Sequence, residues 1–537
     1  MTRQGLARAA GVAALMVVVS AIDADPSTAS SRRAGQLTGS DALVRVYDLI
    51  LNARFEEAEA ELKRACGPST TLTAGPSTSI DARPAPPEAC EVLAATATWW
   101  RILLDPESRA LDRQFTRQVD AAIEATDAWA ARDPDNAEAH FYTGAAYAAR
   151  VQWRVLRDEK VAAARDGKRI KLALERAIEL DPELDDAYFG IGLYQYYADV
   201  APAAAKVLRF LLMLPGGNRA EGLAQMQRTR TRGRLLRGEA DYQLQILYLW
   251  YERRADLAVD LLESLHERYP GNPLFLAQLA DVRDRYQHDI TASLDTWGEL
   301  LDASKTGTVN ESVVAEVQAR LGMARQFEAL DETDLAIEQL REVLDARPAR
   351  PAGAYAEAAL ALGTSEDRLG HRDAATAAYR LAIKSAPAPD AQQIRQRATE
   401  RLHHAPDAVR AGAYRLSLEG LRKLEKGDVE DAMTLLSRSL RLNPKDGVVR
   451  YRYGRALEAG KDEAAALSAF EETIRIAENC PAPIAASAYL DAARVHERLA
   501  HTQQAIEYYR AASAWFGGAA DTRASARRAL VRLHALK

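Results

Sequence analysis

The residues that come closest to a catalytic arrangement are His496, Glu497 and His501, which combine the residue types of a zinc-binding helix. The two histidines are five residues apart, whereas a zinc-binding helix needs a spacing of four to place both on one face. Five residues turn the second side chain by about 140° from the first. We therefore interpret these three as ordinary surface residues and predict no metal site here.

Three other candidate motifs lack a required residue or spacing. Lys305-Thr306-Gly307 matches part of a penicillin-binding signature, but no Ser in the chain is followed three residues later by Lys. The segment 217–222 has the glycine spacing of a phosphate loop, yet Leu223 stands where the motif requires lysine. His403 and His404 are adjacent, so on a helix their rings point about 100° apart. We predict no catalytic residues and no cofactor.

A basic region is the first feature that suggests binding. Residues 150–237 contain 17 Lys and Arg against 11 Asp and Glu, whereas the whole chain has a net charge of −6. Such a surface could hold acidic peptide, anionic lipid or an anionic glycan. The alternative is that the cations stabilise a helix C-terminus and aid solubility. The mild total charge argues against nucleic acid as a partner. The most crowded arginines are Arg228, Arg230, Arg232, Arg234 and Arg237.

The chain contains three cysteines. Cys66 and Cys90 flank a segment rich in Pro, Ser, Thr and Ala, at residues 67–89, which cannot form a packed core. In an oxidising compartment the two thiols could pair and close this loop. The alternative is two unpaired thiols at helix ends. Cys480 is then left over, and we expect it to be a buried small residue.

The first residues have the pattern of an export signal. Arg3 and Arg8 precede an apolar run over residues 9–22, and Ala21 stands at a plausible cleavage position. The run is shorter than the roughly 20 residues needed to span a bilayer. We therefore expect residues 1–21 to be a signal peptide and the protein to be exported to the periplasm or cell envelope. An uncleaved N-terminal anchor is the alternative.

The candidate motifs and the basic region must be positioned by helices, because apolar residues recur along the chain at helical spacing and alternation of apolar and polar residues with a period of two is absent. Near the C-terminus a 34-residue period is visible. Gly420 recurs as Gly454, Ala432 as Ala466, and Leu436 as Phe470. This is the period of a pair of antiparallel helices whose apolar face is buried by neighbouring pairs. The predicted fold is an all-α, right-handed solenoid of helix-turn-helix repeats with helical inserts.

The repeats predict the organisation of the chain. After the signal peptide we expect a disordered leader at 22–40, a degenerate helical array at 41–303, middle repeats at 304–404, and C-terminal repeats with a capping helix at 405–537. Two inserts interrupt the array. Residues 148–161 read as a lengthened, protruding hairpin. Residues 198–217 read as an apolar helix that contacts a membrane surface or a partner, or packs on the array itself.

The chain resembles the tetratricopeptide-repeat family over most of its length, and most closely over residues 405–515, which carry the 34-residue period. The stretch from Trp99 to Gly217 is also similar to uncharacterised bacterial repeat proteins of the cell envelope. The family resemblance implies a protein-interaction scaffold and brings no catalytic residues. Its partner is expected to be another protein; contact of the basic region with a membrane or anionic glycan is the alternative.

The resemblance also implies a binding site. In this family the first helix of each pair lines a concave groove, and its register can be transferred to the C-terminal repeats. Arg455 and Arg494 occupy the same position in successive repeats, so they could meet a carboxylate on an extended peptide. Salt bridges along the helix face are the alternative. The predicted groove residues are Tyr414, Leu421, Tyr451, Arg455, Leu490, Arg494 and Glu497.

Overall fold

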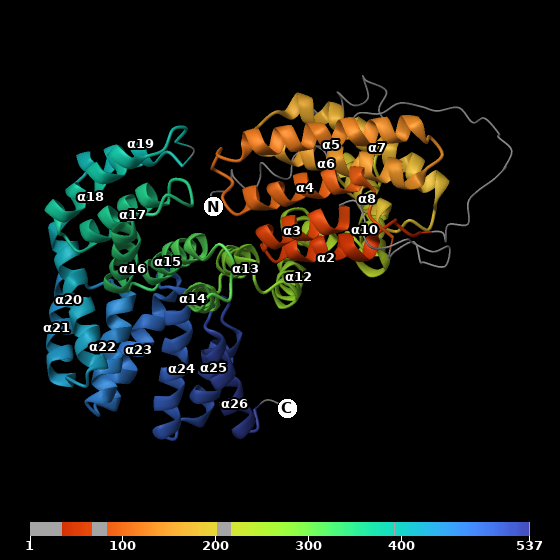
Figure 1. Cartoon of the computed structure of the whole chain (residues 1–537). Coiled ribbons are helices and arrows are strands. Elements are labelled where there is room, and N and C mark those ends of the chain that lie inside the picture. The colour runs from red at the N-terminus through yellow and green to blue at the C-terminus, as the bar shows by residue number, and fades with distance from the viewer. Residues whose placement is uncertain (1–34, 67–82, 201–215, 391, 536–537) are drawn as a thin grey trace. The chain divides into compact units, whose positions relative to one another are not determined.

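The computed structural model describes residues 35–66, 83–200, 216–390 and 392–535. Every regular element in these residues is a helix, which confirms the all-α prediction (Figure 1). The chain forms two compact units, residues 1–275 with 308–311 and residues 276–307 with 312–537. The predicted divisions after residues 303 and 404 are groupings of repeats along the chain, not of compact units, and they stay predictions. No helix in the described residues is long and apolar enough to cross a bilayer.

The first unit is a series of antiparallel helix pairs. Its pairs are α2–α3, α4–α5, α6–α7, α8–α10 and α11–α12, and α13 crosses into the second unit. The helices are α2 (Ser40–Leu51), α3 (Phe55–Cys66), α4 (Pro87–Leu103), α5 (Asp112–Arg132), α6 (Ala137–Leu156), α7 (Lys160–Leu180), α8 (Ala187–Val200), α10 (Arg219–Arg232), α11 (Arg237–Trp250), α12 (Ala255–Arg268) and α13 (Pro273–Arg285).

The lengthened hairpin is formed by α6 and α7, which have 20 and 21 residues. Gly144 of α6 faces Leu174 of α7 so closely that a Cβ on the glycine would lie 2.6 Å from a Leu174 methyl group. The expectation that this hairpin protrudes is wrong. Arg157, at its turn, forms a 2.7 Å ion pair with Asp112 of the equally long α5, so the hairpin lies against its neighbour.

The N-terminal pair closes the first unit on itself. Tyr269 donates a 3.1 Å hydrogen bond to Asp48, and the side chain of Asn272 donates a 2.8 Å bond to the carbonyl of Leu51. In the same region the Gly271 amide donates to the side chain of Asn52. Residues more than 200 positions apart therefore pack together, and α2 contacts both the next pair and the end of the series.

The second unit continues the pairing and ends in a capping helix. A 3-10 turn, Ala477–Asn479, precedes α24. The helices are α14 (Ile290–Thr306), α15 (Ser312–Ala329), α16 (Thr333–Ala346), α17 (Ala354–Arg368), α18 (Arg372–Ser385), α19 (Ile394–His403), α20 (Ala408–Glu425), α21 (Val429–Leu442), α22 (Gly447–Ala459), α23 (Glu463–Arg475), α24 (Ala482–Arg498), α25 (Thr502–Ala514) and α26 (Ala520–Arg532).

One contact recurs in three helix pairs of the second unit. A glycine on the first helix of a pair faces a large side chain 16 residues later on the second helix. An added Cβ would lie 2.7 Å from the side chain at Gly420 and at Gly454, and 2.5 Å at Gly363. The glycine thus allows two helices to approach where a larger residue would force them apart. The facing residues are Leu436, Phe470 and Tyr379 respectively.

The predicted boundaries of the leader at 22–40 and of the loop at 67–89 differ from those in the structure. Residues 35–39, assigned to a disordered leader, are anchored: Leu37 is buried and the side chain of Thr38 donates a 2.8 Å hydrogen bond to Glu138. The loop assigned to 67–89 ends at Pro86, because α4 begins at Pro87, where proline is tolerated in the first helical turn. The predicted signal peptide, residues 67–82 and most of the predicted 198–217 insert lie outside the described residues.

Candidate functional site

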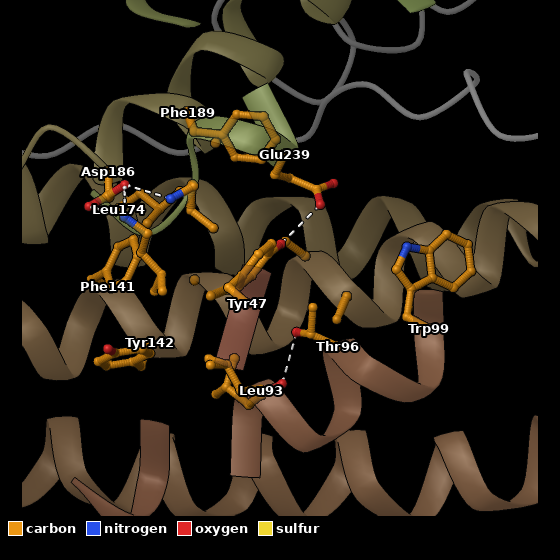
Figure 2. A pocket seen from close by; sticks show the side chains of 18 of the residues that line it. Tyr47, Leu93, Thr96, Trp99, Phe141, Tyr142, Leu174, Asp186, Phe189 and Glu239 are labelled. Atoms are coloured by element: carbon orange, nitrogen blue, oxygen red, sulfur yellow. Dashed lines mark hydrogen bonds between the residues drawn. The ribbon is translucent and has the colours of Figure 1, made fainter. Parts of the chain in front are cut away.

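A pocket lies on the inner side of the first unit (Figure 2). Almost all of its wall comes from the first helices of the pairs, which are α2, α4, α6, α8 and α11, and Leu174 of α7 adds to it. The cavity has a volume of about 60 Å³. Its lining residues are Tyr47, Val92, Leu93, Thr96, Trp99, Phe141, Tyr142, Gly144, Ala145, Ala148, Ala149, Gln152, Leu174, Asp186, Phe189, Gly190, Leu235, Leu236 and Glu239.

Glu239 forms a buried polar group on one wall. Tyr47 donates a 2.9 Å hydrogen bond and Trp100 a 3.2 Å bond to the same carboxylate oxygen, while Gln243 donates to the other at 3.3 Å. Burial raises the pKa of Glu239, and these three donors oppose the shift. The residue therefore connects α2, α4 and α11 through one carboxyl group.

Asp186 forms a second buried group, at the N-terminal end of α11. Its carboxylate accepts hydrogen bonds from the backbone amides of Arg234, Leu235 and Leu236 at 2.9–3.1 Å. Burial raises its pKa, and the backbone donors oppose this shift. A carboxylate is favourable at this place because amides at a helix N-terminus lack partners within the helix. Asp186 thus fixes the start of α11 and with it the position of Glu239.

Two polar atoms of the wall have no hydrogen-bond partner in the described residues. They are Nε1 of Trp99, which is 3% exposed, and the hydroxyl of Tyr142, which is fully buried. The two side chains lie at opposite ends of the pocket, and the indole nitrogen of Trp99 points toward the other lining residues (Figure 2). Buried donors are satisfied in most folded proteins, so an unpaired donor beside a cavity calls for an explanation.

The polar groups of the pocket are few, and its two carboxyl groups are already engaged. Its polar side chains hold each other in place, and no cluster of three or more His, Cys, Asp or Glu in the described part of the chain could hold a metal ion. The histidines of the motif discussed above lie elsewhere, in the second unit. The prediction that His496 lies on the surface is wrong. The residue is buried, and its ring packs against His501 and Tyr508.

The predicted groove residues of the second unit are mostly buried. Tyr414, Leu421, Tyr451 and Leu490 are 5–8% exposed, so they cannot offer an open surface. Glu497 accepts hydrogen bonds from Tyr509 and from Arg532, both at 2.7 Å. These five assignments to an open groove are therefore wrong, because their side chains pack within the unit.

The chain's own turns occupy the space in front of these helices. The side chain of Arg452 donates hydrogen bonds to Ser417 at 2.9 Å and to the carbonyl of Asp331 at 2.8 Å. Tyr414 and Thr333 are hydrogen bonded at 2.9 Å. The turn between α15 and α16 is thus seated against α20 and α22, which explains why the groove register does not leave a groove here.

Only Arg455 and Arg494 of the predicted set remain exposed. Between them lies Asp491, which accepts a 2.9 Å hydrogen bond from Tyr451 and forms a 2.9 Å ion pair with Arg494. Burial raises the pKa of Asp491, and Tyr451, Arg494 and Arg455 oppose the shift. Arg455 forms no salt bridge within the described residues, so its guanidinium is available to a partner.

No family model matches the chain, and no curated protein matches it. The chain is similar to the TPR2AB domain of yeast Sti1 in complex with pHSP90, with 14% identity over 56% of this chain and 97% of that one and a TM-score of 0.21. A tetratricopeptide repeat protein from Parabacteroides merdae shares 16% identity over 55% and 98% of the two chains, with a TM-score of 0.26. The P58(IPK) TPR domain shares 15% over 83% and 98%, with a TM-score of 0.22.

These TM-scores are too low to support an inference, so we assign the fold from the chain's own helix pairs. The 34-residue period and the small-to-large contact 16 residues apart decide it. The fold is a tetratricopeptide-type helical array.

Most arginines of the predicted basic surface of this tetratricopeptide-type array form ion pairs or hydrogen bonds within the fold. Arg228 forms a 2.5 Å ion pair with Asp185, Arg230 one with buried Asp241 at 2.5 Å, and Arg234 one with Asp41 at 2.7 Å. Arg237 donates to the carbonyl of Thr231. Arg232 is the exposed last residue of α10. This arrangement favours cations that stabilise a helix end and its neighbours over a free anion-binding surface.

Cys66 and Cys90 form a disulfide that links the end of α3 to the start of α4, with Cα atoms 6.3 Å apart. Cys480 is partly buried beside Gly447, and burial raises the pKa of its thiol to about 11. The thiol is therefore protonated at neutral pH and weakly reactive.

Sequence reasoning missed the pocket. Its aromatic side chains have the helical spacing of core residues, so nothing local separates Trp99, which borders the cavity, from Trp100, which is fully buried. One signal was available, because the tetratricopeptide register places Glu239 on the apolar face of a helix, where an isolated carboxyl group is unusual.

Proposed function

We propose that this chain is a non-catalytic scaffold that binds another protein through the exposed surface of α22 and α24 around Arg455 and Arg494. The observation that supports the proposal is the pair of exposed guanidinium groups on successive first helices, above a carboxylate that is already paired. The Arg455 guanidinium, which forms no salt bridge within the described residues, presents several donors in a fixed plane and suits bidentate contact with a carboxylate, and the exposed Arg494 adds positive charge beside its ion pair with Asp491. The partner is a segment that carries Asp or Glu.

Export to the periplasm or cell envelope is part of the proposal. It rests on the N-terminal apolar run after Arg3 and Arg8, and the Cys66–Cys90 disulfide supports it, since disulfides persist in oxidising compartments. Expression of the full chain in a bacterial host, followed by fractionation and N-terminal sequencing, tests it. A mature chain that starts near Ile22 in the periplasmic fraction is expected. Full-length chain in the cytoplasm would contradict it.

The binding surface is tested with two double variants of equal charge. Arg455→Glu with Arg494→Glu reverses the proposed surface. Arg438→Glu with Arg475→Glu makes the same change on the second helices α21 and α23, where both arginines are exposed. Partners captured from an envelope extract by the native chain are identified first, and the strongest is then produced pure for binding measurements.

We expect the first double variant to lose the purified partner and the second to retain it. The loss should be accompanied by weaker binding of the native chain as salt rises from about 50 to 500 mM, because exposed charges are screened over a Debye length. Equal binding by both double variants would overturn the assignment to α22 and α24. The basic surface around Arg228 is not favoured, because most of its arginines are already paired.

A further inference from the structure

The pocket of the first unit has the composition of a ligand site. Aromatic side chains from four helices border it, and its apolar part lies between Phe141, Leu174 and Phe189. Thr96, Ala145, Ala148, Gln152 and Leu236 are partly exposed and form its rim. A cavity of about 60 Å³ would hold a few water molecules or enclose part of a short aliphatic chain, the rest of which would pass the rim. Mostly apolar walls with a few placed polar groups are typical of small-molecule sites.

The free polar atoms of the pocket specify one part of the ligand. Trp99 Nε1 can only donate a hydrogen bond, and it lacks an acceptor among the described residues. Leaving such a donor buried and unpaired is unfavourable. A ligand oxygen beside the indole would remove this cost. The Thr96 hydroxyl does not accept this hydrogen bond, since Trp99 Nε1 has no partner among the described residues; it donates to the carbonyl of Val92 at 2.9 Å.

The charges of the pocket specify another part. No Lys, Arg or His lines it, whereas Asp186 and Glu239 both do. An anionic ligand would lie beside two carboxyl groups without a compensating cation. A cationic ligand would have to compete with the donors that both groups already engage, and it could not accept the Trp99 hydrogen bond. The ligand that fits is therefore uncharged.

We propose that the pocket binds an uncharged, mainly aliphatic molecule with one hydroxyl or carbonyl oxygen, which accepts a hydrogen bond from Trp99 Nε1. The aliphatic part lies toward Phe141, Leu174 and Phe189, and the oxygen lies at the end formed by Trp99 and Gln152. This site is independent of the arginine surface of the second unit. Neither proposal depends on the outcome of the other.

Three six-carbon probes of different charge test the proposal on the full chain: 1-hexanol, hexanoate and hexylamine. Binding is followed by NMR on chain labelled with ¹⁵N at the indole of its seven tryptophans. Trp99→Phe identifies the Trp99 signal and removes the donor while it keeps an aromatic ring. We expect 1-hexanol to shift the Trp99 indole signal downfield, and hexanoate and hexylamine to bind at least tenfold more weakly.

Two variants separate the hydrogen bond from the cavity. Trp99→Phe should weaken 1-hexanol binding roughly fivefold, the value of one hydrogen bond of about 1 kcal/mol. Ala148→Phe adds a large side chain at the rim and should abolish binding, with the helix content unchanged. Tighter binding of hexanoate or hexylamine, equal binding by Trp99→Phe, or a Trp99 signal that does not move would each overturn the proposal. If one variant fails to fold, the probe series and the other variant still decide.

Discussion

Tyr47 and Glu239 are 192 residues apart in the chain, and a 2.9 Å hydrogen bond joins them inside the first unit. Both side chains are buried. The bond connects the first described helix to α11 and brings the ends of a linear series of helix pairs together. The inner surface of the series becomes a small pocket for this reason, where an open array would present a groove.

Removal of this bond should destabilise the first unit. Tyr47→Phe deletes one hydroxyl and leaves a carboxylate oxygen of Glu239 with one donor fewer, so we expect a loss of about 1–3 kcal/mol. Urea unfolding followed by tryptophan fluorescence measures it, because five of the seven tryptophans lie in this unit. Tyr188→Phe removes a comparable but exposed bond to the carbonyl of Pro182 and should cost much less. Equal losses would contradict the role assigned to Tyr47.

Glu239 should make the stability of the first unit depend on pH. Its pKa in the folded chain is raised, so the folded state holds its proton at pH values where the unfolded chain has released it. The free energy of unfolding therefore falls as pH rises from the ordinary carboxyl pKa to the raised one. In Glu239→Gln this component is absent, so the native chain should lose stability relative to the variant as the pH rises above the ordinary carboxyl pKa of about 4. Parallel pH profiles would refute this.

The close approach at Gly454 should not tolerate a large side chain. A Cβ there would lie 2.7 Å from the ring of Phe470, and Gly454→Leu is expected to cost about 1–3 kcal/mol through overpacking. Gly412 of α20 is the matched control, because a Cβ there meets nothing within 4 Å. Gly412→Leu should be neutral or stabilising, since leucine favours a helix more than glycine does. Circular dichroism during thermal unfolding distinguishes the two.

The disulfide should contribute measurably to the first unit. It closes a loop of 24 residues, for which the chain-entropy model predicts about 3 kcal/mol. Cys66→Ser with Cys90→Ser is expected to lower the free energy of unfolding by this order in non-reducing buffer. Cys480→Ser serves as the control and should leave the difference between reduced and oxidised samples unchanged. A double variant as stable as the oxidised native chain would exclude a structural role for the bond.

The lengthened hairpin illustrates how far the sequence could be taken. Its extra residues were predictable because Gly144 and Leu174 lie 14 positions farther apart than the standard spacing of 16, and helical periodicity is a local property. Its direction was not predictable, because the ion pair between Arg157 and Asp112 joins residues 45 positions apart. The ion pair between Arg234 and Asp41 was not predictable either, because these residues are also far apart in the sequence. It removes Arg234 from the basic surface.

The sequence by itself determined the all-α class, the 34-residue period and the small residues at helix crossings, since each depends on residue type and spacing along a few turns of helix. It left open whether Cys66 and Cys90 pair, and the structure shows their disulfide. The tertiary structure alone decided what lies on the inner side of each unit. Whether Tyr414 faces a partner or Thr333, and whether Trp99 borders a cavity or a packed core, depends on how small rotations between successive pairs add up. Those rotations bring distant turns and helices into contact, and no local pattern encodes that sum.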